Sequence, residues 1–192
     1  MKPKLVASIL FLTVQAALAS PLGKLSPDFV NPTNGHTYFL LDTGNWQDSE
    51  ASAAFFGGHL VTINDAPEQA WVFSTFSSYN STPRSLWIGL TDKDSEGNFT
   101  WVSGELTSYS NWRSGEPNNN NANEDYVHMH APTTLWPGEW NDVDSAVQFP
   151  THDGFTPHGV VEVVPEPTTL SLVALSLFLG LLIKRGRTQR RV

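Results

Sequence analysis

The stretch GGHLVTINDAPE, which spans Gly57 to Glu68, predicts a strand followed at once by a helix. Its two glycines end the helical pattern that precedes them, and the apolar run from His59 to Ile63 predicts a short strand. Asp65 then offers an N-cap carboxylate, with a glutamate three residues further on and a proline in the first turn, so a helix should run to about Ser78. A strand and a helix in such close succession indicate a domain that mixes both element types.

The segments on both sides extend this pattern. Apolar residues from Trp46 to Phe56 recur at helical spacing and predict an earlier helix. The later helix should bury a stripe that consists of Ala70, Trp71, Phe73 and Phe76. Runs rich in β-branched and aromatic residues predict strands over residues 36–41, 86–90, 99–102, 126–130 and 160–164. Two helices followed by short strands and long polar loops predict an α+β domain.

One of these loops, SGEPNNNNANEDYV from Ser114 to Val127, is unusually rich in oxygen atoms. It holds three carboxylates and five asparagines, although strand-like runs flank it. Calcium is a hard cation that takes six to eight oxygen ligands, which carboxylates, amide carbonyls and backbone carbonyls supply. Because like carboxylates repel one another in an empty site, such a loop would depend on the ion for its order. A loop built from glutamate and asparagine can therefore wrap such a cation.

Five short motifs follow one another between residues 57 and 142. They are Gly57-Gly58-His59-Leu60-Val61-Thr62-Ile63, Leu86-Trp87-Ile88-Gly89-Leu90, Ser110-Asn111-Trp112, Glu116-Pro117-Asn118 and Trp140-Asn141-Asp142. In this order and at roughly this spacing they resemble the C-type lectin domain, and the resemblance covers about His36 to Val164. It implies an α+β C-type lectin-like fold with two helices, short antiparallel β-sheets and long calcium-binding loops.

The resemblance further implies a primary calcium site that also holds sugar. Its ligands would be Glu116, Asn118, Glu124, Asn141 and Asp142, and the backbone carbonyl of Asp142 would complete the shell. In such domains the peptide bond before the proline of the Glu-Pro-Asn motif is cis. Two adjacent sugar hydroxyls would coordinate the ion, while the carboxylates accept hydrogen bonds from them and the Asn amides donate. The order Glu-Pro-Asn, rather than Gln-Pro-Asp, resembles that of lectins for mannose- and glucose-type sugars.

A second calcium position of the resembled family would use Asp92, Glu96, Asn119 and Asp125. Asn119 stands where an acid is usual, which lowers the charge of this position. The other interpretation of residues 91–97 is an ordinary polar hairpin loop.

The chain departs from the resembled family because it has no cysteine, so no disulfide can hold its fold. Phe55 or Phe56, Tyr126 and the end strand near Glu162 stand where that family usually has cysteines, so we expect aromatic packing there. The segment from Val143 to His158 is longer than the usual connection to the last strand. It would either shape the rim of the sugar site or form a mobile insert.

Charge excludes one class of partner. Between Ser20 and Val164 the chain has four basic residues and eighteen acidic ones, a balance that repels nucleic acid and attracts cations. These residues, about 145 in number, suffice for one domain with a core. We therefore expect an N-terminal extension over residues 20–35 and a single lectin-like domain over residues 36–164.

Both ends of the chain carry targeting patterns. Residues 1–19 combine two lysines, an apolar stretch and an Ala-Leu-Ala site, which predicts a cleaved secretory signal peptide. Residues 165–192 contain Pro-Glu-Pro, an uncharged helix over 168–183 and a basic tail. This order resembles the PEP-CTERM signal that bacterial exosortases recognise and remove, and the alternative is a plain membrane anchor. We expect an exported bacterial protein, anchored in the membrane before processing and at the cell surface or outside the cell afterwards.

The leading hypothesis is a secreted calcium-dependent lectin for mannose- or glucose-type sugars of extracellular or surface polysaccharide. The alternative is a structural or protein-binding module of the same fold, in which calcium only stabilises the loops. Multivalency, through a homo-oligomer or surface display, would strengthen weak sugar binding. A glycosidase pair drawn from Glu116, Glu124 and Asp142 and a transition-metal site at His128 and His130 are weaker alternatives. No pairing of nucleophile and base stands out, so the sequence predicts no enzyme.

Overall fold

The computed structural model describes residues 20–144, 154 and 156–165 of the 192-residue chain. This part contains two α-helices, α1 (Trp46–Phe55) and α2 (Ala66–Phe76), and two 3-10 helices, η1 (Tyr79–Ser81) and η2 (Asn120–Ala122). The strands are β1 (Phe29–Val30), β2 (Thr37–Thr43), β3 (His59–Leu60), β4 (Leu86–Thr91), β5 (Thr100–Trp101), β6 (Tyr126–Met129), β7 (Trp140–Val143) and β8 (His158–Val163). The predicted α+β class with two helices is confirmed.

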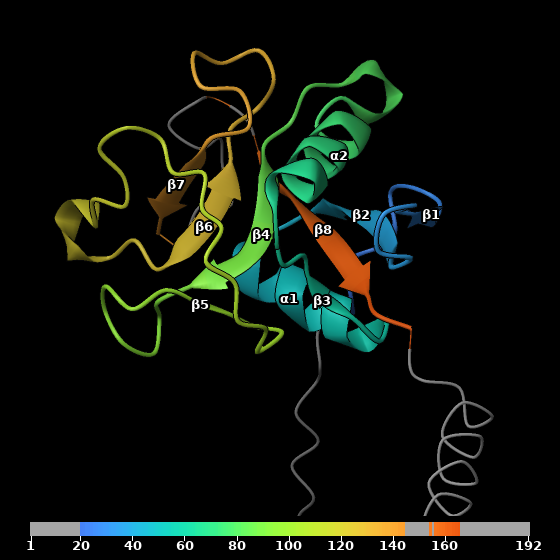
Figure 1. Ribbon diagram of the computed structural model, residues 1–192, viewed down its shortest axis with the longest axis horizontal. Helices are drawn as coiled ribbons and strands as arrows, with labels where there is room; N and C mark the ends of the chain where they lie inside the picture. The colour runs from blue at the N-terminus through green and yellow to red at the C-terminus, as the bar shows by residue number, and fades with distance from the viewer. Residues whose placement is uncertain (1–19, 145–153, 155, 166–192) are drawn as a thin grey trace, which may run out of the picture.

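The strands form one sheet in the order β1-β2-β8-β4-β6-β7, and β3 and β5 pair with β8 and β4 (Figure 1). All pairs are antiparallel except that of β4 with β8, in which Leu86 pairs with His158 and Trp87 with Gly159. The expected antiparallel pairing therefore holds for every pair but one, and β8, which lies between β2 and β4, joins the strands into one sheet. The loop that contains η2 projects beside β6 and β7, at the left of Figure 1.

Both helices begin at side-chain caps. The Oδ1 atom of Asn45 accepts a hydrogen bond from the Asp48 backbone N–H at 2.7 Å and starts α1. The Oδ1 atom of Asp65 accepts one from the Glu68 backbone N–H at 2.8 Å and starts α2, as predicted. Such caps satisfy backbone donors that have no partner within the helix.

The buried face of α2 differs from the predicted stripe. Ala70 is exposed and Trp71 and Phe73 are half-buried, whereas the buried residues of the helix are Glu68, Gln69, Val72 and Phe76. The physical reason is tertiary: Gln69 is held inward because its amide donates to the Gly138 carbonyl at 2.9 Å and its Oε1 accepts from Trp140. With Gln69 held inward, Trp71 and Phe73 lie at the margin of the core, whereas Phe76 is fully buried as predicted.

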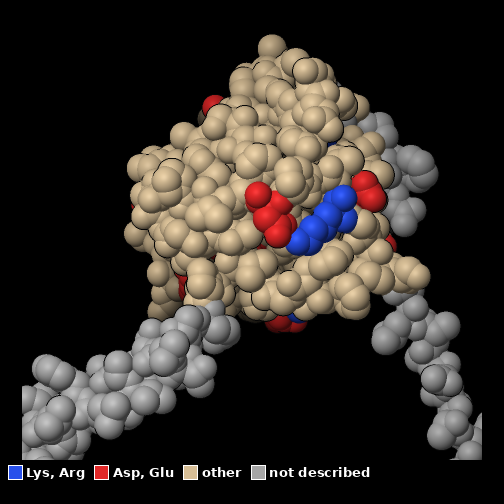
Figure 2. All heavy atoms as spheres, turned by 90° about the vertical axis from the view of Figure 1, so that its right-hand side faces the viewer, with Lys and Arg blue, Asp and Glu red and all other residues tan. Residues whose placement is uncertain are grey.

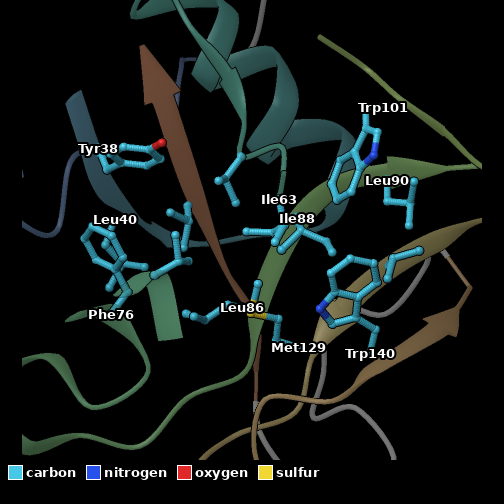
Figure 3. Close-up of a cluster of buried hydrophobic side chains, with 14 residues drawn as sticks. Tyr38, Leu40, Ile63, Phe76, Leu86, Ile88, Leu90, Trp101, Met129 and Trp140 are labelled. Atoms are coloured by element: carbon cyan, nitrogen blue, oxygen red, sulfur yellow. The ribbon is translucent and has the colours of Figure 1, made fainter. Parts of the chain in front are cut away.

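Figure 3 draws Trp140 among the side chains of the main buried cluster, together with Trp101. Its side chain is fully buried, and its ring centroid lies 5.8 Å from those of Trp101, Tyr109 and Trp112 in edge-to-face geometry. Its indole Nε1–H donates to Gln69 Oε1 at 2.9 Å. Trp140 therefore joins helix α2, strand β5 and the loop before residue 113 in one packed unit.

Aromatic contacts occur at two of the positions where disulfides were expected to be replaced. Phe56 packs edge-to-face on Phe39 of β2 with ring centroids 5.5 Å apart, and Tyr126 packs on Trp46 of α1 at 4.7 Å. Phe55, in contrast, leaves 68% of its surface exposed. Phe56, and not Phe55, is therefore the residue that ties the end of α1 to the sheet.

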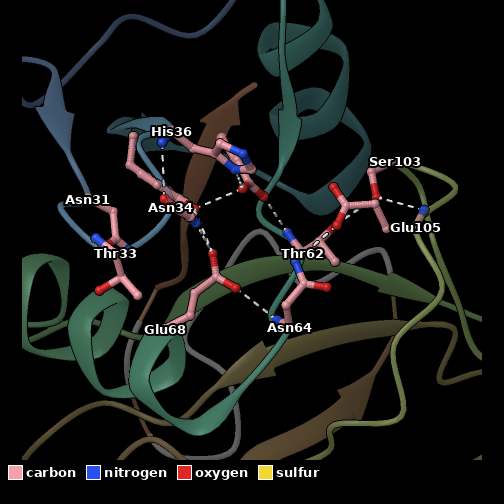
Figure 4. A network of polar contacts seen from close by, with 11 residues as sticks. Asn31, Thr33, Asn34, His36, Thr62, Asn64, Glu68, Ser103 and Glu105 are labelled. Carbon is pink, nitrogen blue, oxygen red and sulfur yellow. Dashed lines mark hydrogen bonds and ion pairs between the residues drawn. The ribbon is translucent and has the colours of Figure 1, made fainter. Parts of the chain in front are cut away.

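A buried polar network joins α2 to the first and last long strands (Figure 4). The hydroxyl of Tyr38 lies 2.6 Å from Glu68 Oε1 and 2.8 Å from Glu162 Oε1, and it accepts from Asn34 Nδ2 at 2.7 Å. His36 Nδ1 lies 2.6 Å from the same Glu162 oxygen. Because a hydroxyl can donate its one proton to only one carboxylate, a proton on Glu68 would satisfy the second contact.

The network gives stability a pH dependence of defined sign. Burial raises the pKa of the Glu68 carboxyl above its ordinary value of 4.5, although hydrogen bonds from Tyr38 and Asn64 oppose this. The folded protein therefore holds this proton more tightly than the unfolded chain, and the free energy of unfolding should fall as pH rises above 4.5. We expect Glu68→Gln to flatten this fall in urea unfolding measured across a pH series.

The matched control is Asp94→Asn, because that side chain is 84% exposed. In Asp94→Asn, the free energy of unfolding should fall with rising pH as steeply as it does in the natural chain. An equally steep fall in the Glu68→Gln variant would show that another group causes it.

Charged side chains are sparse on the face drawn in Figure 2, where acidic and basic groups lie close together. This face is on the right of Figure 1, opposite the loop that contains η2.

Within the described residues, no helix is both long and apolar enough to cross a membrane. The predicted signal peptide, the helix over 168–183 and most of the predicted 143–158 insert lie outside the described residues.

Candidate functional site

The Glu-Pro-Asn loop and strand β7 meet at a small cavity of about 160 Å³. Four of the five predicted calcium ligands line it, namely Glu116, Asn118, Glu124 and Asn141. The fifth, Asp142, lies beside them on β7. The peptide bond between Glu116 and Pro117 is cis, as the resemblance predicts. These five residues, called the loop site below, are therefore brought together from two segments distant in sequence.

Asp142 ties the loop to the sheet. Its side chain is fully buried, and its two oxygens accept the backbone N–H groups of Asn118 at 3.3 Å and Asn119 at 2.9 Å. Burial raises the pKa of Asp142, and the nearby charge of Glu116 raises it further, while the backbone donors oppose the shift. The carboxylate therefore fixes the loop at some electrostatic cost.

Glu124 and Asn141 are held by short hydrogen bonds. Glu124 Oε2 accepts the backbone N–H of Asn120 at 2.6 Å, and the amide of Asn141 donates to the Asp142 carbonyl at 2.8 Å. Burial raises the pKa of Glu124, and the charges of Asp142 and Glu116 add to the shift. Carboxylates that disfavour one another's ionisation in this way favour a cation between them.

The donor atoms suit a hard divalent cation such as calcium. Glu116 Oε2 is buried and has no hydrogen-bond partner, so one carboxylate oxygen in the cavity is available. Across the part of the chain that the structure describes, no three His, Asp or Glu side chains alone form a group able to hold a metal. An ion at the loop site would therefore need the amide oxygens of Asn118 and Asn141 as well, which calcium accepts.

Arg113 belongs to this cavity, although the sequence analysis did not single it out. Its Nη2 atom donates to Glu116 Oε1 and lies 3.5 Å from Asn141 Oδ1. Its guanidinium carbon lies 4.4 Å from the ring centroid of Trp136. The available signal was a cation three residues before the Glu-Pro-Asn motif in a domain poor in basic residues.

The residues of the predicted second calcium position come together in part. Asp92 is buried, its Oδ2 accepts the Gly97 N–H at 2.8 Å, and its Oδ1 has no partner. Asp125 lies beside Asp92, because its backbone carbonyl accepts the Asp92 N–H at 3.3 Å. Desolvation and then the charge of Asp92 raise the pKa values of Glu96 and Asp125. Asn119 differs, because its Oδ1 already accepts the Glu124 N–H at 3.2 Å. In the described residues these three acids do not form a group able to hold a metal, and the asparagine contacts Glu124 of the neighbouring loop.

His128 of β6 and His130, just after that strand, lie side by side. The rings of His128 and His130 have centroids 4.8 Å apart, and His130 packs on Trp136 at 5.5 Å while lining the cavity. No third metal-ligating side chain joins them in the described ranges. Their aromatic contacts indicate a packing role.

Comparisons with known proteins agree with this arrangement. The family model for the Lectin C-type domain matches residues 42–151. The perlucin-like protein of Mytilus galloprovincialis is 36% identical over 107 residues, which are 55% of this chain and 66% of that protein. This chain therefore spans slightly less than two thirds of that relative. A mannose-binding C-type lectin isoform of Oxyuranus scutellatus is 34% identical over 114 residues, 58% of this chain and 71% of that protein.

The fold is shared with solved structures as well. The C-type lectin CEL-I from Cucumaria echinata superimposes with a TM-score of 0.58 at 28% identity, covering 68% of this chain and 91% of that chain. The family model alone spans more than half of the sequence. The chain therefore belongs to the Lectin C-type domain family.

Proposed function

We propose that this protein is a calcium-dependent carbohydrate-binding protein, and that it is a lectin and not an enzyme. The observation that carries the proposal is the buried, unpartnered Glu116 Oε2 in a cavity shared with Asn118, Glu124 and Asn141. A carboxylate oxygen in this state favours a bound cation, because desolvation without a partner is costly. Membership of the lectin family supports the same conclusion.

Calcium bound at the loop site would supply coordination positions for two sugar hydroxyls. The carboxylates of Glu116 and Glu124 would accept hydrogen bonds from these hydroxyls, and the amides of Asn118 and Asn141 would donate to them. Asp142 would hold Asn118 in place through the backbone N–H that it accepts. Asn118 lies exposed at the rim, where a ligand can reach it.

We propose sugars of the mannose and glucose type, in keeping with the order Glu-Pro-Asn and with the mannose-binding isoform among the relatives. An open site of this kind should bind a single sugar with an affinity on the order of millimolar, about 4 kcal/mol. Display in several copies would raise the effective affinity. The terminal patterns support a further proposal of bacterial export followed by exosortase processing.

The direct test is a glycan array probed with the multimerised chain in calcium and in EGTA. Binding to mannose- or glucose-type glycans in calcium alone is the expected result. If calcium raises the melting temperature but no glycan binds, the loop site serves the fold, and the structural module would replace the lectin as the function.

The order of acid and amide in the motif should decide the sugar type. Glu116→Gln combined with Asn118→Asp exchanges acceptor and donor around the ion, so the preference should shift from mannose-like toward galactose-like ligands. Inhibition of array binding by free mannose and free galactose measures this shift. An unchanged ratio of the two inhibitory concentrations would contradict the assignment of these residues to sugar recognition.

A further inference from the structure

Arg113 places a fixed positive charge on one of the proposed calcium ligands. Its guanidinium donates to Glu116 Oε1 and lies 3.5 Å from Asn141 Oδ1, so it contacts two residues of the loop site. Of the residues that line this cavity, Arg113 is the only Lys or Arg. The guanidinium therefore contributes the cavity's one permanent positive charge from the protein.

The carboxylate that receives Arg113 has little freedom to leave it. The Glu116 side chain is only 1% exposed, with Oε1 held by Arg113 and Oε2 buried without a partner. A divalent ion at the loop site would therefore bind a carboxylate that already forms an ion pair with Arg113. Charge shared with a guanidinium weakens the attraction of that carboxylate for a second cation.

Further contacts hold the Arg113 side chain on the side away from Glu116, and they restrict rotation of the guanidinium into solvent. The guanidinium packs over Trp136, and the Arg113 backbone N–H donates to the Trp140 carbonyl at 2.9 Å. The side chain is only 22% exposed. A guanidinium stacked on an indole is stabilised there, because the ring face is negative. The contact with Glu116 is therefore supported by its surroundings.

We propose that Arg113 sets the calcium affinity of the loop site, because its guanidinium and the ion both interact with the Glu116 carboxylate. Arg113 lowers the affinity, so the site fills at a higher calcium concentration than its oxygen ligands alone would require. This inference rests on the proposed calcium site but does not depend on sugar binding.

Calcium titration calorimetry of the full-length chain tests the inference without any sugar. Arg113→Gln removes the charge, and the resulting loss of repulsion should tighten calcium binding roughly tenfold. Arg113→Lys keeps the charge and should bind calcium as the natural chain does. Lys24→Gln is the matched control for net charge, because Lys24 pairs with Asp28 and lies outside the cavity lining.

The three variants separate charge from architecture. If Arg113 merely braced the loop, Gln and Lys would both weaken calcium binding, which would overturn the inference. An unchanged affinity in Arg113→Gln, or an equal gain in Lys24→Gln, would overturn it as well. If calcium binding follows the expected order while no glycan binds, the inference stands and only the lectin function fails.

Discussion

Replacing Asp142 with Asn is expected to abolish calcium-dependent carbohydrate binding and to reduce calcium affinity strongly. The substitution removes a negative charge from the loop site and leaves an amide group facing one of the two backbone N–H donors, of Asn118 and Asn119. Hydrogen bonds to a charged group contribute about 1.5–3 kcal/mol each, so the loop should also lose its attachment to β7. Calcium titration and glycan binding measured on the same sample would show both losses.

The same variant separates the site from the rest of the fold. Its circular dichroism in EGTA should match that of the natural chain, while calcium should no longer raise its melting temperature. Asp94→Asn removes a carboxylate that is 84% exposed and is the control, because it should keep both responses. Undiminished calcium and sugar binding by Asp142→Asn would exclude the loop site as the place of binding.

The largest effect on stability is expected from Trp140→Ala. This side chain is fully buried among Trp101, Tyr109 and Trp112, and truncation of a buried Trp typically costs about 3–5 kcal/mol. Gln69 would also lose the indole donor to its Oε1. We expect the free energy of unfolding, measured by urea denaturation with circular dichroism, to fall by about this amount.

Two further variants define the cause of that loss. Trp140→Phe keeps most of the ring volume and removes the hydrogen bond to Gln69, so it should give an intermediate loss. Leu106→Ala truncates a side chain that is 100% exposed and should change stability little. A loss in Trp140→Ala no larger than that in Leu106→Ala would contradict the central packing role of this residue.

The parts of the fold that could be predicted are those that depend on neighbours in sequence. The cap at Asp65 is set by residues within one helical turn, and the structure confirms it. Strand β7 has no counterpart among the predicted strands, because Asn141 and Asp142 at its centre are disfavoured in strands. The exposed position of Ala70 likewise depends on Gln69 reaching Gly138 and Trp140, which lie far along the chain.

In the candidate site too, the features that depend on local sequence could be predicted, and those that depend on distant contacts could not. The motif order led to Glu116 and Asn118 together with Asn141 and Asp142, and the structure brings them to one place. Arg113 lies only three residues before Glu116, but its position in the cavity also depends on its contact with Trp136, which is distant in sequence. Asn119, which was expected to lower the charge of the second position, accepts the Glu124 N–H with its side-chain oxygen.

The position of β8 has a consequence for the order in which the molecule can assemble. This strand is the last in sequence of those that the structure describes, yet it lies between β2 and β4, and it also pairs with β3. Until residues 158–163 emerge from the ribosome, the strands that flank it have unpaired edges, which are prone to association with other chains. Pairing between residues so distant in sequence is slow. A nascent chain that stops short of residue 158 should therefore remain unfolded and depend on protection from aggregation.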